Sequence, residues 1–308
     1  MDSHKAFVLG ATGVQGGAVA RQLRDLGWSV ATVARNPDST AAQALAAIGV
    51  QVHQGSWTDS AALEGAMAGS KSLFLNLLPT LDNPAGEFEL GREILRIARL
   101  VGVEHVVYSS ALSFPVDDPS HVLETAFKAK TDLEKLVQTS DFPRWTVLRP
   151  GFFMSNYLAP KIHLLYPGTA ETGLFQLAMK PTTRLAMVDH EDIGKYAVAA
   201  FREPDRFHGQ VLSPISEMVP VEQAMETMRR VTGRNIRAKY LSDQEVEAVL
   251  PTQPLMVLQR VAACLIEALG DDGYDALAEA RKWGIETNTF DHFVERHKPD
   301  FDETFRNV

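Results

Sequence analysis

The sequence contains a single cysteine among its 308 residues, Cys264, which lies in the apolar segment LQRVAACLIEAL. One cysteine excludes a disulfide framework and a multi-cysteine zinc site within one chain. The sequence also lacks any run of basic residues, and its formal net charge is -9. Because binding to a polyanion requires a basic surface, we expect no nucleic-acid partner.

Long apolar runs are missing as well. The N-terminus, MDSHKAFVLG, has a few polar residues before an apolar run that is too short for a signal peptide or a membrane span, and we interpret that run as a strand. Hydrophobic residues make up 45% of the chain and charged residues 22%, which is ordinary for a globular protein. We therefore expect a cytoplasmic protein with no membrane partner.

Patterns for hydrolase, P-loop and metal chemistry are absent. The sequence has no Gly-x-Ser-x-Gly elbow, and no Gly-Lys-Ser/Thr follows its glycine-rich stretch. His190, in VDHEDIG, has no second histidine at ligand spacing, so we interpret it as part of a solvated loop. His292 and His297 are five residues apart, and the aromatic residues around them indicate the apolar stripe of a C-terminal helix. We expect no metal site.

Six apolar runs of strand length alternate with helical patterns in the first half of the chain: KAFVLG, SVATVAR, VQVHQG, SLFLNLLP, HVVYSS and WTVLRP. Gly27 and Gly102 predict helix ends, and Asp59 or Ser60 can cap a helix. The alternation predicts an α/β fold with a doubly wound parallel (Rossmann) sheet over residues 1–150.

After Pro150 the pattern changes to short strands, such as GQVLSPI and IRAKYLS, mixed with longer helices. We expect residues 151–308 to form mainly a smaller, mixed α+β substrate-binding region. Residues 186–202 again have a strand-then-helix pattern, with Asp192 as a possible cap, and we expect them to return to the first sheet. The domain boundary is then discontinuous in sequence.

Three glycines spaced three residues apart, Gly10, Gly13 and Gly16, lie between the first predicted strand and the first predicted helix. One glycine allows a left-handed turn, the second allows close approach to a pyrophosphate, and the third lets the helix pack close to the strand. The helix N-terminus adds free N–H groups and a partial positive charge. The pattern predicts a dinucleotide site.

The end of the second predicted strand distinguishes the two nicotinamide dinucleotides. An NAD site usually has an acidic residue there to bind the ribose hydroxyls. This strand instead ends at Ala34 and is followed by Arg35, with Asn36 and Ser39 close behind. A guanidinium suits a 2′-phosphate in charge and geometry, so we expect NADP(H). The alternative is a solvated arginine at a strand end.

The ordered set GATGVQGG, VARNP, GSWTD and RWTVLRPGFFMSN resembles the NmrA-like branch of the atypical short-chain dehydrogenases/reductases, which also contains isoflavone-reductase-like enzymes. The segments VDHEDIGKYAVAAF and WGIETNTFDHFVE extend the likeness over nearly the whole chain. The resemblance implies a Rossmann fold that binds NADP(H).

The resemblance also implies which residues bind the cofactor. The pyrophosphate would lie on the glycine-rich loop, which comprises Gly10, Thr12, Gly13, Val14, Gln15 and Gly16. Arg35 and Asn36 would hold the 2′-phosphate, and Trp57 and Thr58 would lie near the adenine. The residues beside the nicotinamide and its ribose would be Leu77, Leu78, Pro79, Phe153 and Asn156.

Ordinary short-chain dehydrogenases use a Tyr-x-x-x-Lys pair on the helix after the fifth strand. In LETAFKAKTDLEKL the lysine matches Lys130, but Ala126 stands at the tyrosine position. Isoflavone-reductase-like enzymes also lack the tyrosine and are thought to use the lysine, so Lys130 could bind the nicotinamide ribose, donate a proton, or do both. Lys128 lies about 160° around the helix from Lys130 and would face largely away.

Ser109 and Ser110 follow the fifth predicted strand, where short-chain dehydrogenases keep a substrate-polarising serine. We choose Ser110 as the second catalytic candidate, the alternative being a strand-end serine that satisfies loop backbone. Tyr157 is a further phenol, although an aromatic residue in FFMSNYL is more typical of a pocket wall.

Three functions remain open. The leading hypothesis is an NADPH-dependent oxidoreductase that reduces a carbonyl, imine or conjugated double bond of a largely apolar small molecule, in secondary metabolism. The second is a non-catalytic NADP(H) redox sensor that acts through a protein partner, which the missing tyrosine favours. The third is a natural-product isomerase or cyclase that keeps NADP(H) bound without net redox change. The presence of Lys130 favours catalysis over sensing.

Overall fold

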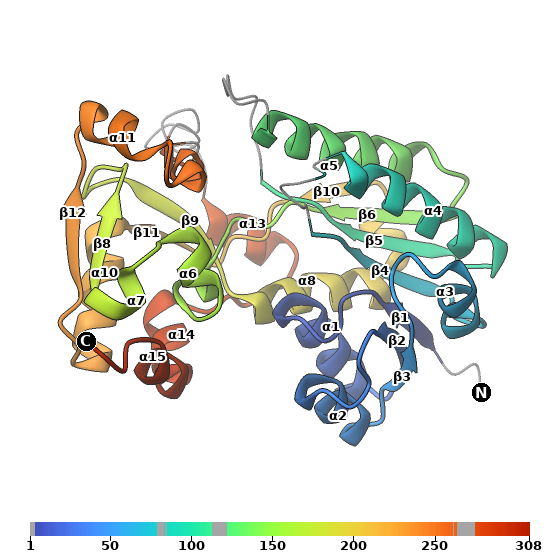
Figure 1. Ribbon diagram of the computed structural model, residues 1–308. Coiled ribbons are helices and arrows are strands. Elements are labelled where there is room, and N and C mark those ends of the chain that lie inside the picture. The colour runs from blue at the N-terminus through green and yellow to red at the C-terminus, as the bar shows by residue number, and fades with distance from the viewer. Residues whose placement is uncertain (1–3, 79–82, 84, 113–121, 261, 264–274) are drawn as a thin grey trace. The chain divides into compact units, whose positions relative to one another are not determined.

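The computed structural model describes residues 4–78, 83, 85–112, 122–260, 262–263 and 275–308. It divides into two compact units, both visible in Figure 1: unit 1 comprises residues 1–150 and 193–214, and unit 2 comprises residues 151–192 and 215–308. Pro79 and Cys264 lie outside the described residues. Over the described ranges, none of the helices has the length and hydrophobicity of a membrane span.

Unit 1 is built on a seven-stranded sheet whose neighbouring strands all run parallel, in the order β10-β6-β5-β4-β1-β2-β3. The strands are β1 (Lys5–Val8), β2 (Ser29–Ala34), β3 (Gln51–Gln54), β4 (Ser72–Asn76), β5 (His105–Ser109), β6 (Arg144–Leu148) and β10 (Gln210–Leu212). The first six coincide with the six apolar runs. The predicted doubly wound α/β fold is therefore confirmed.

Helices cover both faces of this sheet (Figure 1). One face carries α3 (Ser60–Met67), α4 (Gly86–Leu100) and α5 (Val122–Thr139), and the other carries α1 (Val14–Asp25), α2 (Thr40–Ala47) and most of α8 (His190–Arg202). A short helix, α9 (Pro204–Phe207), precedes β10. The apolar cluster beneath α3, α4 and α5 is fully enclosed, because each helix directs one apolar stripe at the Val- and Leu-rich strands.

The predicted helix boundaries in unit 1 follow from local chemistry. Gly27 and Gly102 lie just beyond α1 and α4 with φ of +79° and +82°, a left-handed conformation that glycine adopts without steric cost. Asp59 caps α3, since its carboxylate accepts a hydrogen bond from the Ala62 N–H at 3.0 Å.

Of the residues 186–202 that we expected to return to unit 1, residues 193–202 do so, within a returning segment that runs from Ile193 to Pro214, whereas residues 186–192 belong to unit 2. The expected returning strand, β9 (Arg184–Val188), instead pairs within unit 2 with β11 (Glu217–Pro220) and β7 (Phe152–Phe153). The seventh strand of the first sheet is β10, from the segment GQVLSPI, which pairs with β6. Local periodicity identified these strands, but their partners are chosen by long-range pairing.

The cap of α8 is Asp189 rather than Asp192. Asp189 directly precedes the helix, and its Oδ1 accepts a hydrogen bond from the Glu191 N–H at 3.0 Å. Asp192 lies three residues after Asp189, already inside the first turn of α8, where its carboxylate accepts a hydrogen bond from the Ser216 hydroxyl at 2.6 Å. The prediction placed the helix start too late, because it took the more distant of two aspartates.

Unit 2 contains the three-stranded sheet β11-β9-β7 and a parallel pair, β12 (Arg237–Tyr240) with β8 (Leu174–Leu177). Its helical elements are η1 (Met154–Tyr157), α6 (Lys161–Leu165), α7 (Thr169–Thr172), α10 (Val221–Thr232), α11 (Asp243–Val249), η2 (Pro254–Met256), α13 (Ala276–Lys282), α14 (Phe290–Arg296) and α15 (Lys298–Thr304). Its core combines aliphatic and methionine side chains with a group of aromatic rings, in which Tyr157 and Tyr166 stack with centroids 5.8 Å apart.

Gly16 allows a test of the close packing of α1. A Cβ at this position would lie 2.4 Å from the Gly10 carbonyl oxygen, so the Gly16→Ala variant must displace the helix or the turn. We expect the free energy of unfolding to fall by about 1–3 kcal/mol, measured by urea denaturation.

Gly65→Ala is the matched control, because a Cβ there meets nothing within 4 Å inside α3. Alanine is the better helix former, so this variant should gain roughly 0.5–1 kcal/mol. Equal effects of the two substitutions would contradict the packing argument.

Candidate functional site

The glycine-rich loop lies at the carboxyl edge of the unit 1 sheet, between β1 and α1. Gly10 has φ of +72°, and its carbonyl accepts a hydrogen bond from the Gly13 N–H at 2.9 Å, which closes the turn. Because a Cβ on Gly16 would overlap the Gly10 carbonyl, only glycine lets α1 begin so close to the turn. These contacts show why the first and third glycines are needed.

This loop lies where the strand order reverses. From β1 the sheet continues through β2 and β3 on one side and through β4, β5 and β6 on the other. A Cβ on Gly10 would lie 3.3 Å from Nδ2 of Asn76, at the end of β4, and 3.5 Å from Cζ2 of Trp57. In open parallel sheets, ligands bind outside the carboxyl ends of the strands at such a reversal.

The N-terminus of α1 provides a positive partial charge at this edge. Its N-cap is Gly13; no side chain among the described residues caps the helix, and its first turn contains no acid. Thr12, Gly13 and Val14 are exposed, and the N–H groups of the first turn are available to an anion. Gln15 turns inward instead, where its Oε1 accepts from the Ser109 hydroxyl at 2.7 Å.

Arg35 lies directly after β2 with its side chain exposed. The following turn is held by two local hydrogen bonds: Asn36 Oδ1 accepts from the Asp38 N–H at 3.0 Å, and Ser39 Oγ accepts from the Ala42 N–H at 3.4 Å to cap α2. Asn36 therefore orders the backbone beside Arg35. Thr58 is also exposed, and its hydroxyl pairs with that of Ser56 at 2.9 Å.

Lys130 lies inside unit 1 with its ammonium between α4 and the end of β4. Its Nζ donates to Glu87 Oε1 at 2.6 Å and to the Leu77 carbonyl at 3.4 Å. The Glu87 side chain is fully buried; desolvation raises its pKa, and the Lys130 charge opposes the rise. Because Leu77 directly follows Asn76, the ammonium lies at the same sheet edge as the Gly10 turn.

The two lysines of α5 differ as the helical spacing predicts. Lys128 is 70% exposed and forms an ion pair with Asp132 one turn along the helix.

Helix α5 is attached to the end of β6 by an ion pair, since the Arg149 guanidinium donates from Nε to both carboxylate oxygens of Glu134 at 3.0 and 3.1 Å. Glu134 is one turn beyond Lys130, so this bidentate contact fixes the part of α5 that carries Lys130.

The two serines at the end of β5 face opposite ways. The Ser109 hydroxyl donates a hydrogen bond to Gln15 of α1. The backbone N–H of Ser110 donates to the Leu148 carbonyl at 2.8 Å. The Ser110 hydroxyl lies beside the Tyr108 phenol and lowers the pKa of that phenol, although burial raises it far more. Ser110 therefore shares a face of the strand with Tyr108, on the side of α4 and α5.

The remaining predicted residues are divided between the units. Leu77 is buried and Leu78 is 59% exposed, both directly after β4 in unit 1. Phe153 and Asn156 are half-buried in β7 and η1 of unit 2, and their place near the nicotinamide stays a prediction. Tyr157 is a core residue, fully buried against Tyr166 and Phe290, and burial raises its pKa well above the ordinary range.

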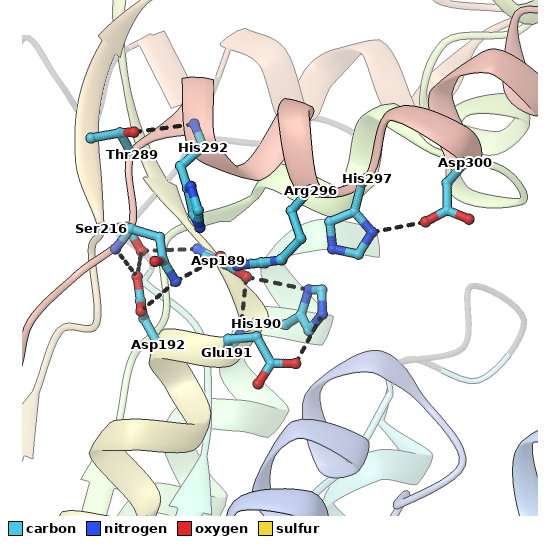
Figure 2. A network of polar contacts seen from close by, with 11 residues as sticks. Asp189, His190, Glu191, Asp192, Ser216, Thr289, His292, Arg296, His297 and Asp300 are labelled. Atoms are coloured by element: carbon cyan, nitrogen blue, oxygen red, sulfur yellow. Dashed lines mark hydrogen bonds and ion pairs between the residues drawn. The ribbon is translucent and has the colours of Figure 1, made fainter. Parts of the chain in front are cut away.

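A buried polar network lies at the start of α8 within unit 2 (Figure 2). Asp189 accepts from Arg296 Nη2 at 2.7 Å and from Asn288 Nδ2 at 3.0 Å. Asp192 accepts from the Asn288 backbone N–H at 2.8 Å and from the Ser216 hydroxyl. The network satisfies two carboxylates that would otherwise be costly to bury, and it joins three distant segments of the chain.

The interpretation of His190 as a solvated loop residue was wrong. It is the first residue of α8 and is only 6% exposed, because its ring packs against Phe293 and His297, with centroids 6.1 and 5.6 Å away. Desolvation lowers the pKa of His190. In the part of the chain that the structure describes, no group of three His, Cys, Asp or Glu residues is arranged to hold a metal ion.

Two residues of the sheet edge were not anticipated. Asn76 is the polar last residue of an otherwise apolar strand, which is a signal that the sequence does contain. Glu87 belongs to the buried face of α4 together with Gly91 and Ile94, so its position four and seven residues before them could have identified it.

Comparisons with known proteins agree with this architecture. The model of the NmrA-like family matches residues 2–289. The NmrA-like family domain-containing oxidoreductase malD of Malbranchea aurantiaca is 29% identical over 255 residues, which cover 77% of this chain and 76% of that protein.

Two solved structures share the fold over nearly the whole chain. NmrA, described as a negative transcriptional regulator and crystallised with NADP, has a TM-score of 0.75 at 18% identity, covering 98% of both chains. The NADPH-dependent quinone oxidoreductase QOR2 of Escherichia coli, complexed with NADPH, has a TM-score of 0.68 at 25% identity, covering 95% of this chain and 99% of that one. Since the family model spans almost the entire sequence, the chain belongs to the NmrA-like family.

Proposed function

We propose that this chain is an NADP(H)-dependent oxidoreductase of the atypical short-chain dehydrogenase type. The observation that carries the proposal is the ammonium of Lys130, which is held at the same sheet edge as the Gly10 turn. The names of malD and QOR2 as oxidoreductases support it.

The residues of this edge fit a dinucleotide. The Gly10–Gly13 turn and the uncapped, exposed start of α1 would hold the pyrophosphate. Arg35 would pair with the 2′-phosphate, and Trp57, against the Gly10 turn, would lie beside the adenine. The Leu77 carbonyl and Lys130 would hold the nicotinamide-side ribose. For the other predicted cofactor residues we propose the positions that the family resemblance implies. These residues are Asn36, Thr58, Leu78, Pro79, Phe153 and Asn156.

Bound NADPH would supply a hydride. Lys130 would then donate the matching proton, because its ammonium lies at this sheet edge and can give up a proton, which the Arg149 guanidinium at the end of β6 does not. Ser110, at the carboxyl end of β5, would hold the substrate oxygen. We propose a carbonyl, imine or conjugated double bond of a largely apolar molecule as substrate, and a role in secondary metabolism, which the family resemblance supports.

A second candidate is a non-catalytic redox sensor that acts through a protein partner. Two observations favour it: the sequence has Ala126 at the tyrosine position, and the NADP-bound neighbour NmrA is a transcriptional regulator. Titration calorimetry with NADPH and NADP⁺ separates the two functions. Similar affinities together with NADPH consumption would support the enzyme, whereas a strong preference for one oxidation state without consumption would support the sensor.

Arg35→Ala should weaken NADPH binding by about 2 kcal/mol, roughly 30-fold in Kd, because a charge-assisted pair with the 2′-phosphate is lost. NADH binding should be almost unchanged, since NADH lacks this phosphate. Calorimetry of both nucleotides measures the difference, with Arg206→Ala, an exposed arginine on α9, as the control. Equal losses for NADPH and NADH would show that Arg35 does not recognise the phosphate.

Lys130→Met should lower the rate of NADPH consumption by roughly a hundredfold, as expected for loss of a general acid. The rate is followed by NADPH absorbance with an aromatic aldehyde and a quinone as probes. Lys128→Met, on the exposed face of the same helix, is the matched control and should retain the wild-type rate. Equal rates for Lys130→Met and wild type would remove Lys130 from the mechanism.

A further inference from the structure

Two buried oxygen atoms beside the Lys130–Glu87 pair have no hydrogen-bond partner among the described residues. One is Oε2 of Glu87, whose other oxygen is bound by Lys130 at 2.6 Å. The second is the phenol oxygen of Tyr108, on β5. Buried polar atoms are nearly always paired, so two unpaired oxygens next to one ion pair require an explanation.

These groups lie close enough to influence one another. The Glu87 charge raises the pKa of the Tyr108 phenol, and the phenol in turn lowers the pKa of Glu87. Ser110, which directly follows β5, lowers the pKa of the same phenol. Ser110, Tyr108, Glu87 and Lys130 therefore form a continuous polar group that reaches from the end of β5 to the ammonium.

We propose that Glu87, whose Oε1 binds the Lys130 ammonium at 2.6 Å, is the positioning residue that keeps Lys130 charged and directed at the sheet edge. This inference rests on the proposed function. A buried amine without a counter-ion loses its proton readily, and an amine cannot act as the acid. Glu87 supplies the counter-ion from α4, and the Tyr108 phenol lowers the pKa of this carboxyl, which favours its ionised form against the effect of burial.

Beside the Lys130–Glu87 pair and the Tyr108 phenol, the described residues place one further carboxylate that acts on this group. From α5 the carboxylate of Glu134 acts on Tyr108, and it is bound by Arg149, which follows β6. Glu134 nevertheless contributes a negative charge that Tyr108 senses. Among the described contacts, the carboxylate partner of Lys130 is Glu87.

The test compares Glu87→Gln, which removes the charge and keeps the size, with Glu87→Asp, which keeps the charge. Lysine labelled with ¹³C at Cε reports the protonation of Lys130 in the nucleotide-free protein, and Lys130→Met assigns its signal. We expect the Lys130 titration of Glu87→Gln to move to lower pH by about one to three units, and that of Glu87→Asp to move less. An unchanged titration in Glu87→Gln would overturn the inference.

The second readout separates positioning from a merely structural pair. NADPH affinity and NADPH consumption by wild type and Glu87→Gln are measured across the same pH range, and the alkaline loss of both should move with the Lys130 titration. If Lys130 titrates earlier but neither pH profile moves, the pair is structural and the inference fails. If wild type binds no NADPH at any pH, the proposed function fails, and the ¹³C titration still decides whether Glu87 sets the charge.

Tyr108→Phe tests the phenol separately. Without this donor the Glu87 carboxyl should take up a proton at higher pH, so the acid-side loss of NADPH consumption should move upward by up to about one pH unit. Tyr196→Phe, which removes a second buried phenol of unit 1 on α8, is the control and should leave the profile in place. Identical shifts in both variants would exclude a specific role for Tyr108.

Discussion

The contact between the start of α1 and the Gly10 carbonyl is the constraint on which the sheet edge of unit 1 depends. Because no side chain separates them, the helix N-terminus lies directly on the turn. The Gln15–Ser109 hydrogen bond then ties this first turn to β5, two strands away from β1 across β4. One backbone contact thus fixes the relative positions of the loop, the helix and the ends of the central strands.

The chemistry of this edge depends on a second constraint, which is the cost of burying charge. A lysine inside the unit is tolerated because Glu87 faces it, and the end of α5 is held because Arg149 binds Glu134. Each carboxylate belongs to a helix on the same face of the sheet as Tyr108. Each of these charges would be costly to bury alone, and each is paired with an opposite charge. The Glu87 contact therefore fixes the direction of Lys130, although α5 has Ala126 at the position of the tyrosine.

Much of unit 1 could be predicted from the sequence, and the reasons are physical. Parallel strands that are covered on both faces are continuous apolar runs, which is why the buried strands β1, β2, β4 and β5 were found, and glycines with positive φ ended α1 and α4 as expected. The edge strand β3, whose residues are largely exposed, was found from its place in the alternation of strand-length and helical segments. The partners of β9 and β10 could not be predicted, because the pairing of these strands is decided by segments far apart in sequence. His190 was misjudged for the same reason: its burial comes from α14, about a hundred residues later.

The division of the chain has a consequence for its synthesis. The last strand of the unit 1 sheet, β10, leaves the ribosome only after residues 151–192, which belong to unit 2, and those residues must wait for the segment from Ile215 onward before their own core can close. The two units are thus interleaved along the nascent chain. The usual order, in which an N-terminal domain completes its fold while the next is still being made, is unavailable to this protein: a β6 edge stays open until residue 212 emerges.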